Sequence, residues 1–120
     1  VGIYWRVAGS RFVSSLGESR FDDEGRFLLA QFGRLTVVSA YFPKGSGKDQ
    51  DNSRVPYKMD FYRAVFERIE QKRKTGPVFV LGDYNTAHHS IGPNFTPSFQ
   101  TFFEIIRNAR RSRSIGEQSP

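Results

Sequence analysis

Apolar positions divide the first half of the chain into short segments bounded by turn residues. Four of these segments are rich in β-branched and aromatic residues and predict strands. The four predicted strands are Val1–Val7, Arg11–Leu16, Arg26–Phe32 and Leu35–Phe42. Gly33-Arg34 predicts a hairpin between the last two strands, and the break at Ala8-Gly9-Ser10 allows the first two to pair.

The last of these predicted strands is largely apolar on both faces. Side chains alternate between the two faces of a strand, so an apolar pattern on both sides is typical of a central strand in a sandwich. One face carries Leu35, Val37, Ser39 and Tyr41, and the other carries Thr36, Val38, Ala40 and Phe42.

A helical period begins at Pro56 and continues to about Arg73. Gly76-Pro77 ends this helix, and the apolar run Val78–Leu81 returns to the sheet. The order strand, helix, strand predicts an α/β fold. The apolar stripe of the helix consists of Tyr57, Phe61, Val65 and Ile69, widened by Tyr62 and Phe66.

Beyond Asn85 a loop carries the adjacent histidines His88 and His89. Adjacent histidines on a loop point apart, and no further ligand follows at helical spacing, so we interpret them as surface or supporting residues and not as metal ligands. Thr96-Pro97 predicts the start of a second helix, which ends in arginines and a polar tail that we expect to be disordered. We therefore expect one domain over residues 1–92, and a divergent helix with a basic tail over 93–120.

Composition narrows the class of protein. With 120 residues, of which 38% are hydrophobic, the chain is one domain or part of one and has enough apolar residues for a core. No run approaches the roughly 20 consecutive apolar residues that cross a bilayer, so no membrane association is expected. The absence of cysteine excludes a cysteine nucleophile and fits a reducing compartment, and we expect a cytoplasmic protein.

The formal net charge is +6. A basic surface attracts polyanions through steering and counterion release, which makes nucleic acid the leading class of partner. Charge alone is equally compatible with a basic surface that serves solubility.

Asp83 and Asn85 directly follow the apolar run Val78–Leu81 and the bend at Gly82. Residues two apart at a strand end share a face, so their side chains can converge on one substrate atom. A carboxylate can hold a metal or accept a proton, and an amide can orient a phosphate oxygen without adding charge. The same pair is, on its own, about as readily a turn held by bonds from side chain to backbone.

Asp22, Asp23 and Glu24 form an acidic cluster before a predicted strand. The cluster could hold a cation, but its place in a loop favours a solvated acidic turn. The loop after Phe42 is polar and long for a connector, which favours a binding role.

Four pieces of the sequence occur in a specific order and span Val1 to about Ile91. They are FDDEGR at Phe21–Arg26, VVSAYFPKGS at Val37–Ser46, KMDFYRAVFERIE at Lys58–Glu70 and PVFVLGDYNTAHHSI at Pro77–Ile91. In this order they resemble the exodeoxyribonuclease III and apurinic/apyrimidinic endonuclease family of the endonuclease/exonuclease/phosphatase superfamily. After Ile91 the chain departs from the family pattern.

This resemblance implies a four-layer α/β/β/α sandwich, of which the chain would hold part. It also implies a hydrolase that cleaves DNA phosphodiesters with Mg²⁺ (or Mn²⁺), acting on double-stranded DNA at abasic sites or at 3′ ends. By the same resemblance, Asp83 would orient or deprotonate the attacking water or assist the leaving oxygen, and Asn85 would position Asp83 and the phosphate. Tyr41 would contact the scissile phosphate, whereas alone it is more often a packed strand aromatic. A weaker metal role for Asp83 and Asn85 is also implied.

Other residues gain roles from the same comparison. Lys44, Lys48 and Arg54, in the loop beside Tyr41, are expected to contact DNA phosphates. Arg26 resembles an arginine of the family's EGR segment, where a structural role is expected.

The family pattern also includes groups that this sequence lacks: a first asparagine and metal-binding glutamate before it, and a later aspartate and Asp-His pair after it. We therefore expect a central fragment of a DNA repair nuclease that is a monomer when complete. The alternatives are another phosphoesterase of the superfamily and a basic nucleic-acid-binding remnant without catalysis.

Overall fold

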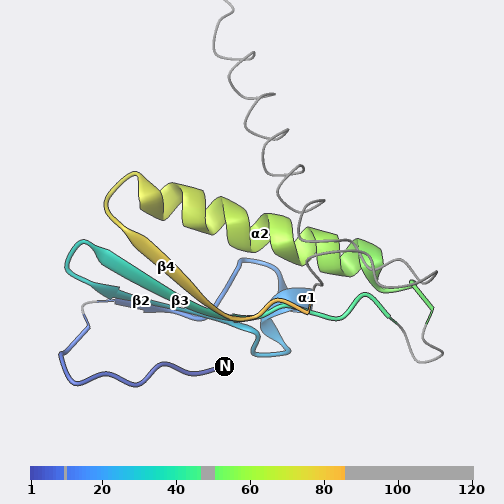
Figure 1. Ribbon diagram of the computed structural model, residues 1–120, viewed down its shortest axis with the longest axis horizontal. Coiled ribbons are helices and arrows are strands. Elements are labelled where there is room, and N and C mark those ends of the chain that lie inside the picture. The colour runs from blue at the N-terminus through green and yellow to red at the C-terminus, as the bar shows by residue number, and fades with distance from the viewer. Residues whose placement is uncertain (10, 47–50, 86–120) are drawn as a thin grey trace, which may run out of the picture. The chain divides into compact units, whose positions relative to one another are not determined.

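The computed structural model describes residues 1–9, 11–46 and 51–85. Strands and helices follow one another along the chain in the order shown in Figure 1. They are β1 (Arg11–Val13), α1 (Ser19–Asp22), β2 (Phe27–Phe32), β3 (Leu35–Tyr41), α2 (Val55–Arg73) and β4 (Val78–Asp83).

The chain divides into two compact units. The first unit consists of Val1–Pro43 and Lys58–Asn85, and it contains the sheet and most of α2. The second consists of Lys44–Tyr57 and Thr86–Pro120, of which the structure describes 44–46 and 51–57. The predicted boundary between residues 92 and 93 lies outside the described residues and stays a prediction.

The four strands form one sheet in the order β1-β2-β3-β4. Strands β1, β2 and β3 pair antiparallel, and the predicted hairpin at Gly33 is confirmed, with Gly33 at φ 58°. Strands β3 and β4 pair parallel, as expected for two strands joined through a helix. The predicted α/β class is therefore confirmed, and the first unit supplies one sheet and one helical layer.

Helix α2 packs across one face of this sheet (Figure 1). Aromatic side chains fill the space between them. The Phe42 ring stacks on Tyr62 with centroids 4.4 Å apart and meets Phe61 edge-on at 5.6 Å. Phe61 in turn meets Phe21 of α1 at 5.5 Å. Phe61, Tyr62 and Val65 of the predicted stripe are thus buried in the core, together with Thr36, Val38 and Ala40 of one face of β3 and with Phe42 directly after it.

The prediction of a strand at Val1–Val7 is wrong. No strand occurs in this segment, and β1 pairs with β2 instead. Trp5 stacks on Phe12 at 4.7 Å and meets Phe32 at 6.5 Å, whereas Val1, Tyr4 and Val7 are exposed. A β-rich composition therefore does not by itself make a strand, because β-propensity depends on the packing that a position has in the fold.

The acidic cluster before β2 is helical only at Asp22, whereas Asp23 and Glu24 lie in an exposed turn, as predicted. Residues Ser19–Asp22 form the short helix α1, with Phe21 buried at 1% exposure. The Asp22 carboxylate accepts hydrogen bonds from Ser15 Oγ at 2.6 Å and from the Leu16 N–H at 2.8 Å. Bonding from Ser15 above all lowers the pKa of Asp22, so this carboxylate serves the local structure.

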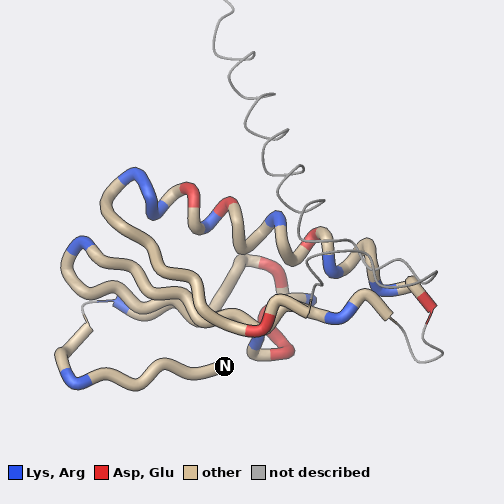
Figure 2. Tube along the Cα trace, viewed as in Figure 1, with Lys and Arg blue, Asp and Glu red and all other residues tan. Residues whose placement is uncertain are grey.

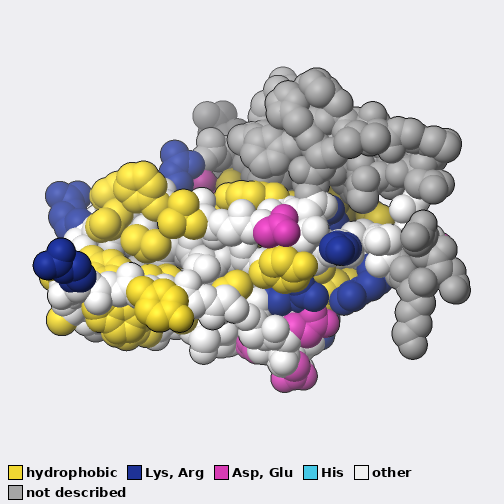
Figure 3. Space-filling model, turned by 60° about the horizontal axis from the view of Figure 1, so that its bottom comes forward, with side chains coloured by type: hydrophobic (Ala, Val, Ile, Leu, Met, Phe, Trp, Pro, Cys, Tyr) yellow, Lys and Arg dark blue, Asp and Glu magenta, His cyan; other side chains and the backbone are white. Residues whose placement is uncertain are grey.

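The sheet face away from α2 is only partly covered. Phe79 and Leu81 of β4 are 60% and 59% exposed, and Figure 3 shows hydrophobic side chains gathered on this side of the molecule. A pocket of about 550 Å³ lies next to Tyr41. In the part of the chain that the structure describes, no helix combines the length and hydropathy needed to cross a bilayer.

Candidate active site

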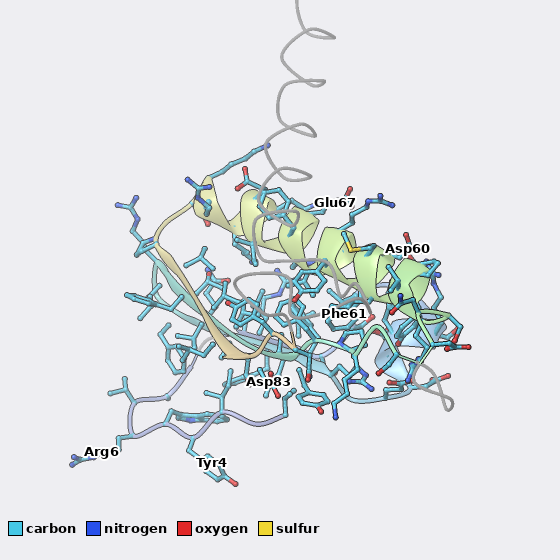
Figure 4. All side chains as sticks on the ribbon, turned by 45° about the vertical axis from the view of Figure 1, so that its right-hand side comes forward. Tyr4, Arg6, Asp60, Phe61, Glu67 and Asp83 are labelled. Atoms are coloured by element: carbon cyan, nitrogen blue, oxygen red, sulfur yellow. The ribbon has the colours of Figure 1, made fainter. Side chains whose placement is uncertain are left out.

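Tyr41 and Asp83 lie side by side where β3 and β4 end. The two strands run parallel, and their register pairs Tyr41 with Asp83. Both side chains are exposed, Tyr41 to 39%, and share the sheet face away from α2. Figure 4 shows Asp83 at the end of β4. The parallel crossover therefore places a phenol and a carboxylate, 42 positions apart in the sequence, next to each other.

Asp83 and Asn85 form a tight turn after β4. The Asn85 N–H donates to Asp83 Oδ1 at 2.9 Å, and Asn85 has a left-handed backbone with φ 47°. The Asn85 side chain turns to β3, where Nδ2 donates to the Phe42 carbonyl at 2.9 Å. The side-chain-to-backbone turn weighed for this pair is thus present. It leaves Asp83 Oδ2 and the Asn85 Oδ1 acceptor for other contacts, so the turn and a catalytic role are compatible.

Arg26, the residue directly before β2, supports Tyr41. Its guanidinium lies 5.0 Å from the centre of the Tyr41 ring, and Nη1 donates to the Tyr41 carbonyl at 3.3 Å. Arg26 also pairs with Glu24. These residues, with Val1 and Gly25, line the pocket of about 550 Å³. The structural role expected of Arg26 fits these contacts, and the Tyr41 side chain lines the pocket.

Lys58 and Tyr62 of α2 were not predicted to belong to the site. Lys58 is fully buried, and its Nζ donates to the Asn85 carbonyl at 2.6 Å. Tyr62 Oη donates to the Tyr84 carbonyl at 2.5 Å. Burial lowers the pKa of Lys58, and the Asp83 carboxylate opposes this shift. The sequence held a signal: Lys58 falls within the apolar stripe, three and four positions before Phe61 and Tyr62.

The described residues do not form a metal site by themselves. Among them no group of three or more His, Asp or Glu side chains lies close enough to hold a metal ion. In the acidic cluster, Asp22 bonds Ser15 and Glu24 pairs with Arg26, so the cluster does not converge on a cation. Asp83 and Asn85 could offer one carboxylate and one amide oxygen, fewer than the six that Mg²⁺ needs, with substrate phosphate and water left to supply the rest.

The predicted phosphate-binding cations lie in the second unit or outside the described residues. Lys44 is exposed, and the Arg54 guanidinium lies 5.1 Å from the centre of the Tyr57 ring. Lys48, His88 and His89 lie outside the described residues. Figure 2 shows acidic and basic residues alternating along α2, so this helix is not a uniformly basic surface.

Comparison with known proteins gives partial matches. The chain is 32% identical over 69 residues to exodeoxyribonuclease III of Haemophilus influenzae, a match that covers 53% of this chain and 26% of that protein. It is 37% identical over 94 residues to DNA-(apurinic or apyrimidinic site) endonuclease 2 of Mus musculus, covering 69% and 18%. The protein of the same name from Schizosaccharomyces pombe is 36% identical over 66 residues, covering 53% and 12%.

The matches thus span between 12% and 26% of the length of these relatives. No protein-family model matches the chain. The relatives bear the names that the sequence motifs predicted, which confirms the resemblance.

Proposed function

We propose, from the confirmed resemblance of this chain to exodeoxyribonuclease III and the abasic-site endonucleases, that its site takes part in hydrolysis of DNA phosphodiesters. The substrate class is double-stranded DNA with abasic sites or free 3′ ends, as in base excision repair. The relatives' names support nuclease chemistry on DNA, and the positive net charge favours such a polyanion.

The observation that carries this proposal is the pairing of Tyr41 with Asp83 in the register of two parallel strands. The pairing brings an exposed neutral donor next to an exposed carboxylate. A phosphodiester placed over both could receive a hydrogen bond from the phenol while a water molecule is held by the carboxylate.

In the proposed reaction a water oxygen attacks phosphorus, and the bond from phosphorus to the leaving sugar oxygen breaks. Asp83 orients this water and accepts its proton, or assists the leaving oxygen, and the sugar oxygen leaves as a hydroxyl group with a proton from Asp83 or from solvent. Tyr41 donates to the phosphate oxygen on which negative charge increases. The Asn85 N–H donates to one carboxylate oxygen of Asp83, and the other oxygen contacts the attacking water.

A divalent cation, Mg²⁺ or Mn²⁺, is part of this proposal through the resemblance alone. When bound, it would supply positive charge to the phosphate. The described residues supply too few ligands for it, so the roles of Tyr41, Asp83 and Asn85 are argued without it.

The test is incision of a labelled duplex that contains one abasic site, by the whole chain with Mg²⁺, with Mn²⁺ and with chelator. Asp83→Asn should abolish cleavage and keep DNA binding, since the amide retains the shape of the carboxylate without its charge. Asp60→Asn is the matched control, because Asp60 is an acidic residue on α2 that pairs with Arg20 and Arg63.

The outcomes separate the three functions considered. Cleavage that is lost in Asp83→Asn and kept in Asp60→Asn supports the nuclease. Faster hydrolysis of inositol phosphates than of DNA would support another phosphoesterase. Salt-dependent DNA binding with no cleavage by either protein would contradict catalysis and support a binding remnant.

A further inference from the structure

We propose that Lys58 is a positioning residue of this site: its buried ammonium group, together with the Tyr62 hydroxyl, holds the turn that presents Asp83. The inference rests on the proposed function for its catalytic consequence. Its structural basis is independent and consists of contacts within the first unit.

Three successive carbonyl groups, beginning with that of the last residue of β4, are each bonded by a different donor. The Asp83 carbonyl accepts from the Phe42 N–H at 2.9 Å, that of Tyr84 from Tyr62 Oη at 2.5 Å, and that of Asn85 from Lys58 Nζ at 2.6 Å. Two of these donors are side chains of α2. At a strand end such carbonyls are ordinarily left to water, so these bonds fix the turn.

The two donors are four residues apart on α2 and therefore lie on the same face of the helix. Helix α2 runs opposite to β4, so the earlier donor, Lys58, reaches the later carbonyl of Asn85, and Tyr62 reaches that of Tyr84. The helix thus holds the two consecutive peptide groups on either side of the Asn85 Cα and restricts rotation about the φ and ψ bonds of Asn85.

The bond from Lys58 affects Asp83 through Asn85. With its carbonyl held by Lys58, the Asn85 residue keeps its left-handed backbone, and its N–H points to Asp83 Oδ1 at 2.9 Å. Lys58 does not touch the substrate in this arrangement. It acts on the carboxylate through the intervening turn.

Packing alone gives no reason for a lysine at this position. Burying an ammonium costs several kcal/mol unless hydrogen bonds and opposite charge compensate. An apolar residue would complete the stripe formed by Phe61, Tyr62 and Val65 without that cost. The compensation that Lys58 finds lies at the turn: the Asn85 carbonyl and the nearby Asp83 carboxylate.

The experiment compares Lys58→Met with Lys58→Arg, Tyr62→Phe and the control Lys72→Met in the full chain. Lys72 is a second lysine of α2, bonded to Gln31 Oε1 at 3.2 Å, and its replacement removes the same charge. On the abasic duplex, we expect Lys58→Met to lower kcat by about tenfold or more with KM within about twofold, because a small displacement of a reacting group is costly. Lys58→Arg should recover part of this loss, and Tyr62→Phe should show a smaller one.

Amide hydrogen exchange tests the inference without catalysis. In Lys58→Met the Asn85 N–H should exchange about tenfold faster, whereas the Val65 N–H inside α2 should keep its protection.

Equal effects of Lys58→Met and Lys72→Met on kcat, or unchanged exchange at Asn85, would overturn the inference. If the wild-type chain cleaves nothing, the proposed function fails, and the exchange result still decides whether Lys58 holds the turn. Should Lys58→Met not fold, Tyr62→Phe is judged by the same exchange measurement, with faster exchange at Asn85 in support and unchanged exchange against.

Discussion

The Phe42 N–H donates to the Asp83 carbonyl at 2.9 Å, which joins the residue after β3 to the last residue of β4. The Asn85 side chain returns a bond to the Phe42 carbonyl. Both backbone polar groups of Phe42 are therefore bonded to the turn, while its ring stacks on Tyr62 and Tyr84. The same residue anchors the core and aligns the ends of the two strands that carry Tyr41 and Asp83.

Gly82 is the residue that allows β4 to lie this close to β3. Its φ is 144°, and a Cβ at this position would overlap the Ala40 carbonyl oxygen. Gly82→Ala should therefore lower the free energy of unfolding by roughly 3 kcal/mol or more, since strain and overlap add. Chemical denaturation measures this loss.

Gly17→Ala is the control for backbone strain alone, because Gly17 also has a positive φ, 91°, but no atom within 4 Å of a new Cβ. It should cost about 1 kcal/mol. Equal losses in the two variants would contradict the role given to the contact with Ala40.

The Tyr41 hydroxyl is expected to act on the phosphate and not on the fold. Tyr41→Phe keeps the ring beneath the Arg26 guanidinium, so unfolding should change little. Incision should fall by roughly 10- to 100-fold, because a donor to developing charge is removed. Tyr4→Phe is the control, since Tyr4 is fully exposed and points away from the sheet in Figure 4. An unchanged rate in Tyr41→Phe would refute a contact between the phenol and the reacting phosphate.

The sequence predicted the elements whose signals are local. The hairpin at Gly33, the period of α2 and the apolar run of β4 are each encoded within a few residues, and the structure contains all three. The strand predicted at Val1–Val7 failed because whether β-rich residues pair depends on a partner strand, which a local pattern does not specify.

Part of the site could be predicted from the sequence, and part could not. Asp83 and Asn85 are close in sequence, so their proximity could be inferred, and the resemblance linked them to Tyr41. The contacts of Lys58 and Tyr62 with the turn depend on how α2 docks on the sheet. Lysine is ordinarily exposed, so the place of Lys58 within the apolar stripe was a weak signal, and it did not identify the turn as its partner.

Asp22 is expected to stabilise the fold in a pH-dependent manner. Its pKa is lowered below the ordinary 3.8 by hydrogen bonds from Ser15 and the Leu16 N–H. Between the folded-state pKa and 3.8 the unfolded chain binds more protons, so this stabilisation is complete above 3.8 and is lost as the pH falls through the folded value.

Asp22→Asn should therefore lower the free energy of unfolding by about 1 kcal/mol at neutral pH, and the difference from wild type should shrink in acid. Urea unfolding across this range measures both. Asp23→Asn is the neighbouring control, and a loss in Asp22→Asn that is independent of pH would count against the ionised form as the bonded one.

Lys58 is expected to affect the free energy of unfolding in alkaline solution, in contrast to Asp22. Burial lowers its pKa below the ordinary 10.5, so between the folded-state value and 10.5 the unfolded chain binds the additional proton. Its contribution to the free energy of unfolding must then rise with pH across that window.

Tyr84, whose pKa is raised by burial, contributes with the opposite sign in alkaline solution, so wild type alone cannot isolate Lys58. The difference between wild type and Lys58→Met does isolate it, and this difference should move in favour of wild type as the pH rises toward 10.5. Parallel curves for wild type and Lys58→Met would mean that the buried ammonium titrates alike in the folded and unfolded chain, which is incompatible with the position found for it beneath the Asp83 turn.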